Sequence, residues 1–233
     1  MTAIIGIKAY SGAKEIIFAA DSQMTDVEDN RIPVSKVTGF NKIATGKDWA
    51  MGLAGIYCPP LRSFFKNLRS ESSSSNLIEN AVNNKYFAEV NELNTKIAKK
   101  YGDDCSAHFL LASSKPEVGM YFVDKMGNVL ERPVYEDETT DYLTIGSGSD
   151  SARSYLEKRM DTKYLDQEGI SHANALRYAY EAIEQTDDLY TGGPIEIVVL
   201  KQDSVNSYGA KLRRAARKAV RTELENIIKE SER

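Results

Sequence analysis

The stretches TAIIGIKAY (Thr2–Tyr10) and EIIFAAD (Glu15–Asp21) decide the fold class of this chain. Both runs are apolar and rich in β-branched residues, and a short segment containing the pair Ser11-Gly12 separates them. Two such runs joined by a glycine-containing turn predict an antiparallel β-hairpin. A hairpin at this place favours an antiparallel sheet over a parallel one.

Working outward from this hairpin, the predicted elements come in groups rather than in alternation. Pro33 limits its surroundings to an edge strand or loop, and WAMGLA (Trp49–Ala54) is predicted to be a strand covered on both faces. The remaining expected elements are helices over 59–68, 78–101, 151–159 and 173–183, strands over 107–112, 119–123, 128–131, 142–145 and 195–200, and a charged C-terminal helix over about 206–233. Grouped strands argue against β-α-β units. The prediction is an α+β four-layer α-β-β-α sandwich, one domain over residues 2–233.

The composition excludes several classes of protein. Of the 233 residues 42% are hydrophobic and 27% charged, and the net charge of −4 excludes a globally basic nucleic-acid binder. Cys58, Cys105, His108 and His172 are too few and too scattered for a disulfide framework or a zinc site. No apolar run reaches the roughly 20 residues of a membrane helix, and no signal peptide is visible. The expected location is the cytoplasm.

Two segments invite other functional interpretations. GSGSD (146–150) lacks the closing glycine of a serine-nucleophile elbow, and Ser151 stands where a dinucleotide loop needs glycine. A tight turn from strand to helix is therefore the favoured interpretation, and a Ser-His-Asp triad has no positive support. Six basic residues between Lys211 and Arg221, without interleaved aromatics, indicate the solvated face of a helix rather than a nucleic-acid site.

Thr2 is the remaining candidate for chemistry. Methionine aminopeptidases remove Met1 when the next side chain is small, and the mature chain would then carry a free Thr2 amine. Such a residue joins a hydroxyl nucleophile to an amine whose pKa of about 8 lets it act as a base near neutrality. A neighbouring cation would lower the pKa of that amine, and a carboxylate would hold the cation in place. Taken alone, a threonine here is only a permissive start residue.

Six segments in the right order resemble a β-type subunit of the proteasome, a family that includes the bacterial peptidases that work with heat-shock unfoldases. They span roughly residues 2–200 and are TAIIGIK (2–8), FAADSQMT (18–25), SKV (35–37) with GLAG (52–55), IGSGS (145–149), and DLYTGGPIEI (188–197). The resemblance implies the same four-layer sandwich and an N-terminal-nucleophile hydrolase.

The resemblance also implies roles for individual residues. Thr2 matches the nucleophile, its amine the proton shuttle, and Asp21 the carboxylate that anchors a lysine. Lys36 is expected to be that lysine, because Lys-Val after a polar loop fits the family pattern, and Lys42 before Ile43 is the alternative. The backbone N–H of Gly55 would form the oxyanion hole.

The same resemblance supplies the rest of the expected site. The residues expected to bind the Thr2 amine and its water are Ser147, Asp188 and Thr191. The residues expected to bind substrate are Met24, Thr25, Val34, Leu53 and Tyr57. Because the expected pocket is uncharged and mostly apolar, cleavage after large hydrophobic residues is predicted.

The function expected from this resemblance is threonine endopeptidase activity on unfolded proteins or peptides. It requires no metal or organic cofactor, and no nucleic acid or membrane is an expected partner. A homo-oligomeric ring or similar assembly is expected, with an ATP-dependent unfoldase as a candidate regulator. Two alternatives remain at this point: a non-catalytic structural subunit of the same fold, and a transpeptidase that passes the acyl group to an amine.

Overall fold

The structure is a computed structural model that describes most of the chain. The described residues are 2–10, 13–27, 33–37, 41–55, 58–70, 85–102, 105–115, 117–130, 141–160, 170–186 and 192–208. For 24–27, 33–37, 68–70 and 85–88 the description covers the backbone alone.

The first sheet has five strands in the order β10-β1-β2-β11-β12, and every neighbouring pair is antiparallel. Its strands are β1 (Ala3–Tyr10), β2 (Lys14–Asp21), β10 (Tyr142–Gly146), β11 (Ile195–Lys201) and β12 (Ser204–Tyr208). The predicted hairpin is confirmed as β1–β2, with Ile4 opposite Ala20. The predicted start of the C-terminal helix at about residue 206 is too early, because 206–208 belong to β12. The rest of the predicted helix lies outside the described residues.

The second sheet is also antiparallel, in the order β5-β6-β7-β8-β9. Its strands are β5 (Ile43–Thr45), β6 (Trp49–Ala54), β7 (His108–Ser113), β8 (Gly119–Val123) and β9 (Val129–Leu130). β3 (Met24–Val27) and β4 (Pro33–Val37) form a separate two-stranded ribbon that begins its second strand at Pro33. Pro33 is thus the first residue of a strand that pairs with β3. This position suits proline, which has no N–H to donate to a strand ladder.

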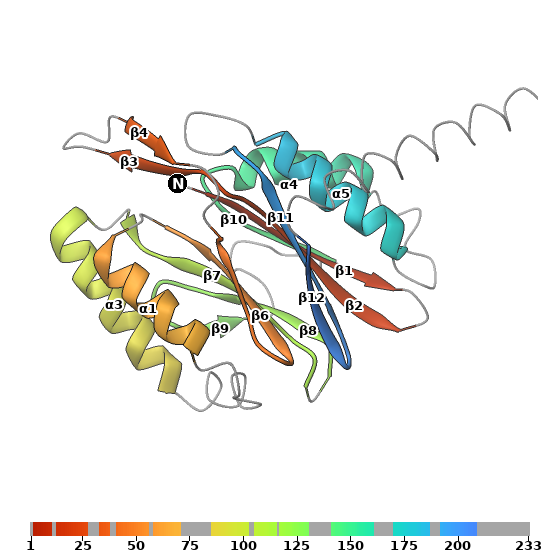
Figure 1. Cartoon of the computed structure of the whole chain (residues 1–233), viewed down its shortest axis with the longest axis horizontal. Helices are drawn as coiled ribbons and strands as arrows, with labels where there is room; N and C mark the ends of the chain where they lie inside the picture. The colour runs from red at the N-terminus through yellow and green to blue at the C-terminus, as the bar shows by residue number, and fades with distance from the viewer. Residues whose placement is uncertain are drawn as a thin grey trace, which may run out of the picture.

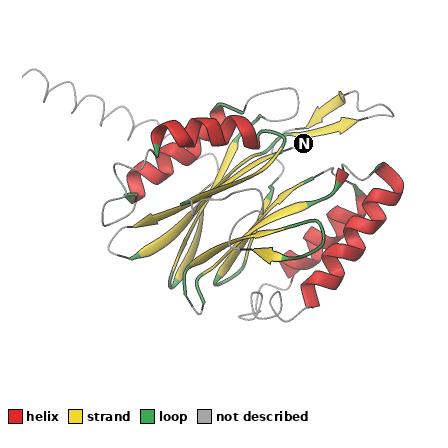
Figure 2. Cartoon of the chain, turned by 180° about the vertical axis from the view of Figure 1, so that it is seen from behind, coloured by secondary structure: helices red, strands yellow, loops and turns green. Residues whose placement is uncertain are grey.

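Among the described residues, two pairs of helices cover the outer faces of the sheets. They are α1 (Pro59–Ser70) and α3 (Lys85–Tyr101) on the second sheet, and α4 (Ser149–Arg159) and α5 (His172–Glu184) on the first. Figure 1 shows each pair against its own sheet, and Figure 2 shows from behind that the sheets lie between the helices. The four-layer α-β-β-α sandwich is therefore confirmed.

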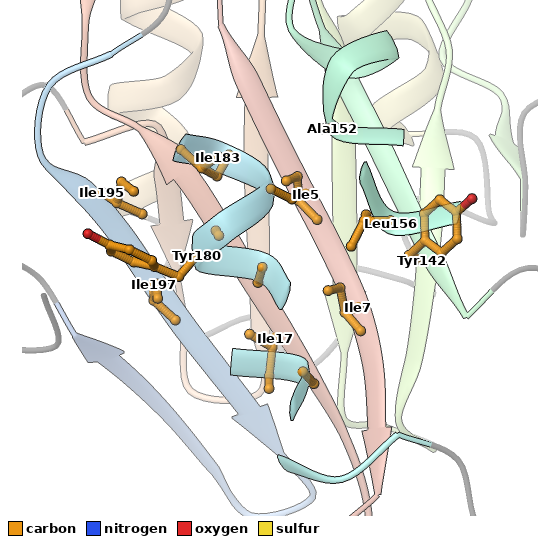
Figure 3. Close-up of a cluster of buried hydrophobic side chains, with 14 of the residues drawn as sticks. Ile5, Ile7, Ile17, Tyr142, Ala152, Leu156, Tyr180, Ile183, Ile195 and Ile197 are labelled. Carbon is orange, nitrogen blue, oxygen red and sulfur yellow. The ribbon is translucent and has the colours of Figure 1, made fainter. Parts of the chain in front are cut away.

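The strands alternate their side chains between separate apolar layers, as the period of two requires. Ile4, Phe18 and Leu110 lie between the two sheets, whereas Ile5 and Ile17 face α4 and α5 in the cluster drawn in Figure 3. A third cluster packs the outer face of the second sheet against α1 and α3. Each fully buried large aliphatic side chain contributes about 1.5–3 kcal/mol, so these layers fix the sheets against one another.

The antiparallel pairing brings one end of several elements to the same place. Ala3 lies opposite Gly146 and Asp21 opposite Ile195 in the register of the first sheet. The start of β1 therefore lies beside the end of β2, the end of β10 and the start of β11. Lys42 directly precedes β5 of the other sheet and reaches this end as well.

Candidate active site

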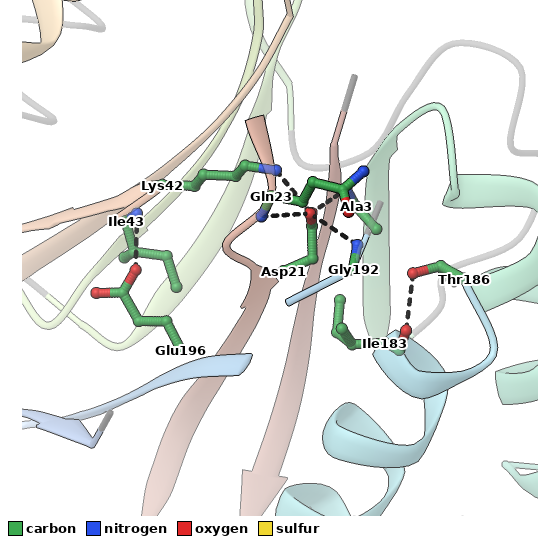
Figure 4. Close-up of polar contacts among 9 residues, drawn as sticks. All are labelled: Ala3, Asp21, Gln23, Lys42, Ile43, Ile183, Thr186, Gly192 and Glu196. Atoms are coloured by element: carbon green, nitrogen blue, oxygen red, sulfur yellow. Dashed lines mark hydrogen bonds and ion pairs between the residues drawn. The ribbon is translucent and has the colours of Figure 1, made fainter. Parts of the chain in front are cut away.

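Asp21 is the centre of the polar cluster at this end of the first sheet (Figure 4). Its side chain is fully buried. The backbone N–H of Ala3 donates to Oδ1 at 2.8 Å, while the N–H groups of Gln23 and Gly192 donate to Oδ2 at 3.1 and 3.2 Å. Hydrogen bonds from three separate segments fix the orientation of the carboxylate.

Lys42 completes the coordination of this carboxylate. Its Nζ lies 2.9 Å from Oδ1 and 2.8 Å from Oδ2 of Asp21, and the residue is 3% exposed. Burial lowers the pKa of the Lys42 ammonium from its usual value, while the Asp21 carboxylate opposes this shift. Oδ1 accepts from both Lys42 and the Ala3 N–H, so the ammonium lies beside the start of β1.

The structure pairs Asp21 with Lys42, the alternative lysine. Asp21 was expected to anchor Lys36, yet both of its oxygens are bound by Lys42. Lys36 lies in β4, opposite Thr25 in the two-stranded ribbon, and its side chain is outside what the structure describes. The physical reason is the position of Lys42 immediately before β5, from which its side chain reaches the end of β2.

Thr2 lies at the start of β1 and is only 4% exposed. Its carbonyl oxygen accepts from the N–H of Gly148 at 3.5 Å. A Cβ on Gly146, whose φ is +100°, would stand 1.8 Å from the same oxygen. Ser147, exposed between these two glycines, is thus on a turn whose backbone is in contact with Thr2.

Gly55 follows the last residue of β6. A Cβ on Gly55 would lie 3.0 Å from the Cα of Ala107, so the Gly55 backbone packs against the chain just before β7. Leu53 is 5% exposed and packs in the cluster under α1 and α3. Its expected place in a substrate pocket stays a prediction.

Several expected site residues fall beyond the description. Asp188, Thr191 and Tyr57 lie outside the described residues, and of Met24, Thr25 and Val34 only the backbone is described. The segment next to Thr191 is nonetheless placed, because Gly192 donates to Asp21 and its carbonyl accepts from the Ser22 N–H at 3.2 Å.

The backbone donors of Ala3, Gln23 and Gly192 were not foreseen from the sequence. No side-chain pattern signals them, because a main-chain N–H is present at almost every position and only the register aims it. The sequence indicates that the glycine pair 192–193 is part of a motif, but it assigns no contact to the pair. The structure gives its first glycine the role of a donor to Asp21.

The described part of the chain contains neither a cluster of metal-binding side chains nor a helix that could span a membrane. Within it, no group of three or more His, Cys, Asp or Glu is placed to hold a metal ion. None of its helices is long and apolar enough to cross a membrane. Cys58 and Cys105 are free and buried.

Two antiparallel sheets stacked between two helical layers, with β1 inside the first sheet, define the sandwich of the N-terminal-nucleophile hydrolases. The family model described as proteasome subunit matches residues 2–200. The chain belongs to the proteasome subunit family. No individual curated protein matches it.

Proposed function

We propose that this chain is a threonine peptidase in which Thr2 is the nucleophile. The observation that carries the proposal is the buried ion pair of Lys42 and Asp21 beside the start of β1. A cation held at that place would lower the pKa of a free Thr2 amine and stabilise negative charge that develops nearby. A subunit kept only for assembly has no need of such a pair.

The reaction begins once the peptide bond before Thr2 has been cleaved. The free amine takes the proton of Thr2 Oγ while Oγ attacks the substrate carbonyl, and the Gly55 N–H receives the developing oxyanion. The protonated amine then gives its proton to the leaving amine, which leaves an acyl ester on Thr2. Water activated by the same amine hydrolyses the ester. In this proposal Lys42 holds the place first expected for Lys36.

The substrate we propose is an unfolded polypeptide bound in extended form by strand addition. In an apolar substrate pocket, a charged side chain of the substrate would lose its hydration without gaining a partner. Burial of a large apolar side chain there stabilises binding by about 1.5–3 kcal/mol. We therefore expect cleavage after residues such as Leu or Tyr. Enclosure of the site in a homo-oligomeric assembly in the cytoplasm, served by an unfoldase, belongs to the same proposal.

Intact mass and turnover of fluorogenic peptides test the proposal together. We expect a mature chain that begins at Thr2, turnover that Thr2→Ala abolishes, and a mass increase on Thr2 after treatment with a β-lactone. The exposed Thr95→Ala on α3 is the matched control and should keep full turnover. Active protein that still carries Met1 would contradict the mechanism, and an assembled but inert wild type would identify a structural subunit. Transfer of the acyl group to an added amine would identify a transpeptidase.

A further inference from the structure

Asn94 is a buried polar side chain on a helix face that is otherwise apolar. It is 5% exposed, and its neighbours along the inner face of α3 are Val90, Leu93 and Ile97. An amide at such a place loses its hydration and is retained only where hydrogen bonds replace it. The proposed chemistry at Thr2 makes no use of this residue.

Among the described residues the Asn94 amide makes its hydrogen bonds to backbone groups. Oδ1 accepts from the N–H of Ala107 at 2.7 Å, and Nδ2 donates to the carbonyl oxygens of Ala107 at 3.1 Å and Lys125 at 2.8 Å. One side chain thus binds both polar groups of Ala107. It also ties that residue to the turn that follows β8.

Ala107 is the residue on which the Gly55 backbone rests. The ladder of β6 and β7 ends with Ala54 opposite His108, so Gly55 and Ala107 lie one step beyond the last pair. A methyl group on Gly55 would stand 3.0 Å from the Cα of Ala107 and 3.4 Å from the carbonyl oxygen of Ser106. The backbones of Gly55 and Ala107 thus leave too little room for a side chain between them, so we expect a shift of Ala107 to displace Gly55.

We propose that Asn94 is a positioning residue that aims the Gly55 N–H at the oxyanion by fixing Ala107. The inference rests on the proposed function. An oxyanion donor acts by preorganisation, and an error of about 1 Å in the position of a catalytic group lowers the rate about 100-fold. Ground-state binding of an extended peptide depends on other contacts, so the step that suffers is turnover and not binding.

The test compares Asn94→Ala with Asn91→Ala in the full chain. Asn91 is exposed on the same helix, so its variant controls for helix composition. Turnover of a fluorogenic peptide is measured per active site titrated with a β-lactone, at a temperature well below the unfolding midpoint of every variant. We expect Asn94→Ala to lower kcat about 10- to 100-fold with KM within about twofold, and Asn91→Ala to match the wild type. If Asn94→Ala does not fold, Asn94→Ser replaces it. Its kcat is expected to lie between the wild-type value and the value expected for Asn94→Ala.

The outcomes separate this inference from the function on which it rests. A lower melting temperature with wild-type kcat per titrated site would reduce Asn94 to an anchor for α3 and overturn the inference. A raised KM with unchanged kcat would overturn it as well. A wild type without turnover that depends on Thr2 would remove the proposed function and the positioning role together.

Discussion

The ammonium of Lys42 bridges both carboxylate oxygens of Asp21, and the two side chains are 4% and 0% exposed. Removing two charges from water costs several kcal/mol per ion, and well-packed apolar residues of similar size would often stabilise a fold more. Three backbone N–H groups further commit Asp21 to this arrangement. The proposed chemistry at Thr2 therefore explains the presence of this ion pair better than a contribution to the stability of the fold does.

Replacement of Lys42 should lower kcat strongly, whereas replacement of Lys36 should leave kcat unchanged. We expect Lys42→Met to lower kcat by about 100- to 1,000-fold or more, because the cation beside the start of β1 is lost. The buried Asp21 carboxylate would also lose its partner, at a cost of about 3–5 kcal/mol in the free energy of unfolding. Turnover and urea unfolding of both variants measure these effects. An inactive Lys36→Met beside an active Lys42→Met would return the catalytic role to Lys36.

The lowered pKa of Lys42 predicts a pH dependence of stability. An unfolded chain holds the Lys42 proton up to about pH 10.4, whereas burial makes the native protein release it at a lower pH. Between these values the unfolded state binds more protons, so this residue makes the free energy of unfolding rise with pH. Urea unfolding from about pH 8 to 10 should therefore give a more positive slope for the wild type than for Lys42→Met. Parallel curves would contradict the direction of the shift.

Gly146 should be irreplaceable because of its contact with Thr2. The chain offers a matched control in Gly102, since the φ values of the two glycines are +100° and +97° but a Cβ on Gly102 would meet nothing within 4 Å. Both alanine variants suffer similar backbone strain, of about 1–3 kcal/mol. Only Gly146→Ala collides with the Thr2 carbonyl, and we expect it to lose about 100-fold in kcat. Equal kcat values in the two variants would show that the collision is relieved without moving Thr2.

The sheet core could be predicted from sequence because its strands carry their own signals. WAMGLA and the apolar runs around Ile4 and Ile197 have no competing helical period, and the structure places them in strands β6, β1 and β11. β5 is three residues long, too short for a period to show, so the sequence predicts no strand after Lys42. Lys36 is preferred because Lys-Val after a polar loop fits the family pattern, and without β5 no predicted element places Lys42 at the end of β2.

The site was predictable only as far as side chains define it. The family resemblance, together with the N-terminal position of Thr2, assigns roles to Thr2 and Asp21, and the structure places them directly before β1 and at the end of β2. Asn94 is, in the sequence, one more position on an amphipathic helix. Its partners Ala107 and Lys125 are 13 and 31 residues away, and a contact made by backbone across that separation leaves no local pattern.

A second buried carboxylate should govern stability without touching activity. Glu15 is 2% exposed, and its Oε2 lies 3.0 Å from Nδ1 of His172 and 3.3 Å from Nζ of Lys201. No partner for Oε1 is found among the described residues. Because removing one cation weakens the hydrogen bonding of a buried charge, Lys201→Met should lower the free energy of unfolding by about 1–3 kcal/mol.

Lys14→Met is the control for this variant, since Lys14 is exposed beside Glu15 on β2 and should change stability by less than about 0.5 kcal/mol. Asp21 lies six residue steps of extended strand, about 20 Å, from Glu15, so kcat should equal the wild-type value in both variants. Urea unfolding and peptide turnover on the same preparations provide the measurement. A loss of kcat in Lys201→Met in proportion to its loss of stability would contradict this prediction. It would show that β2 transmits a change at Glu15 to the site at Asp21 within the folded protein.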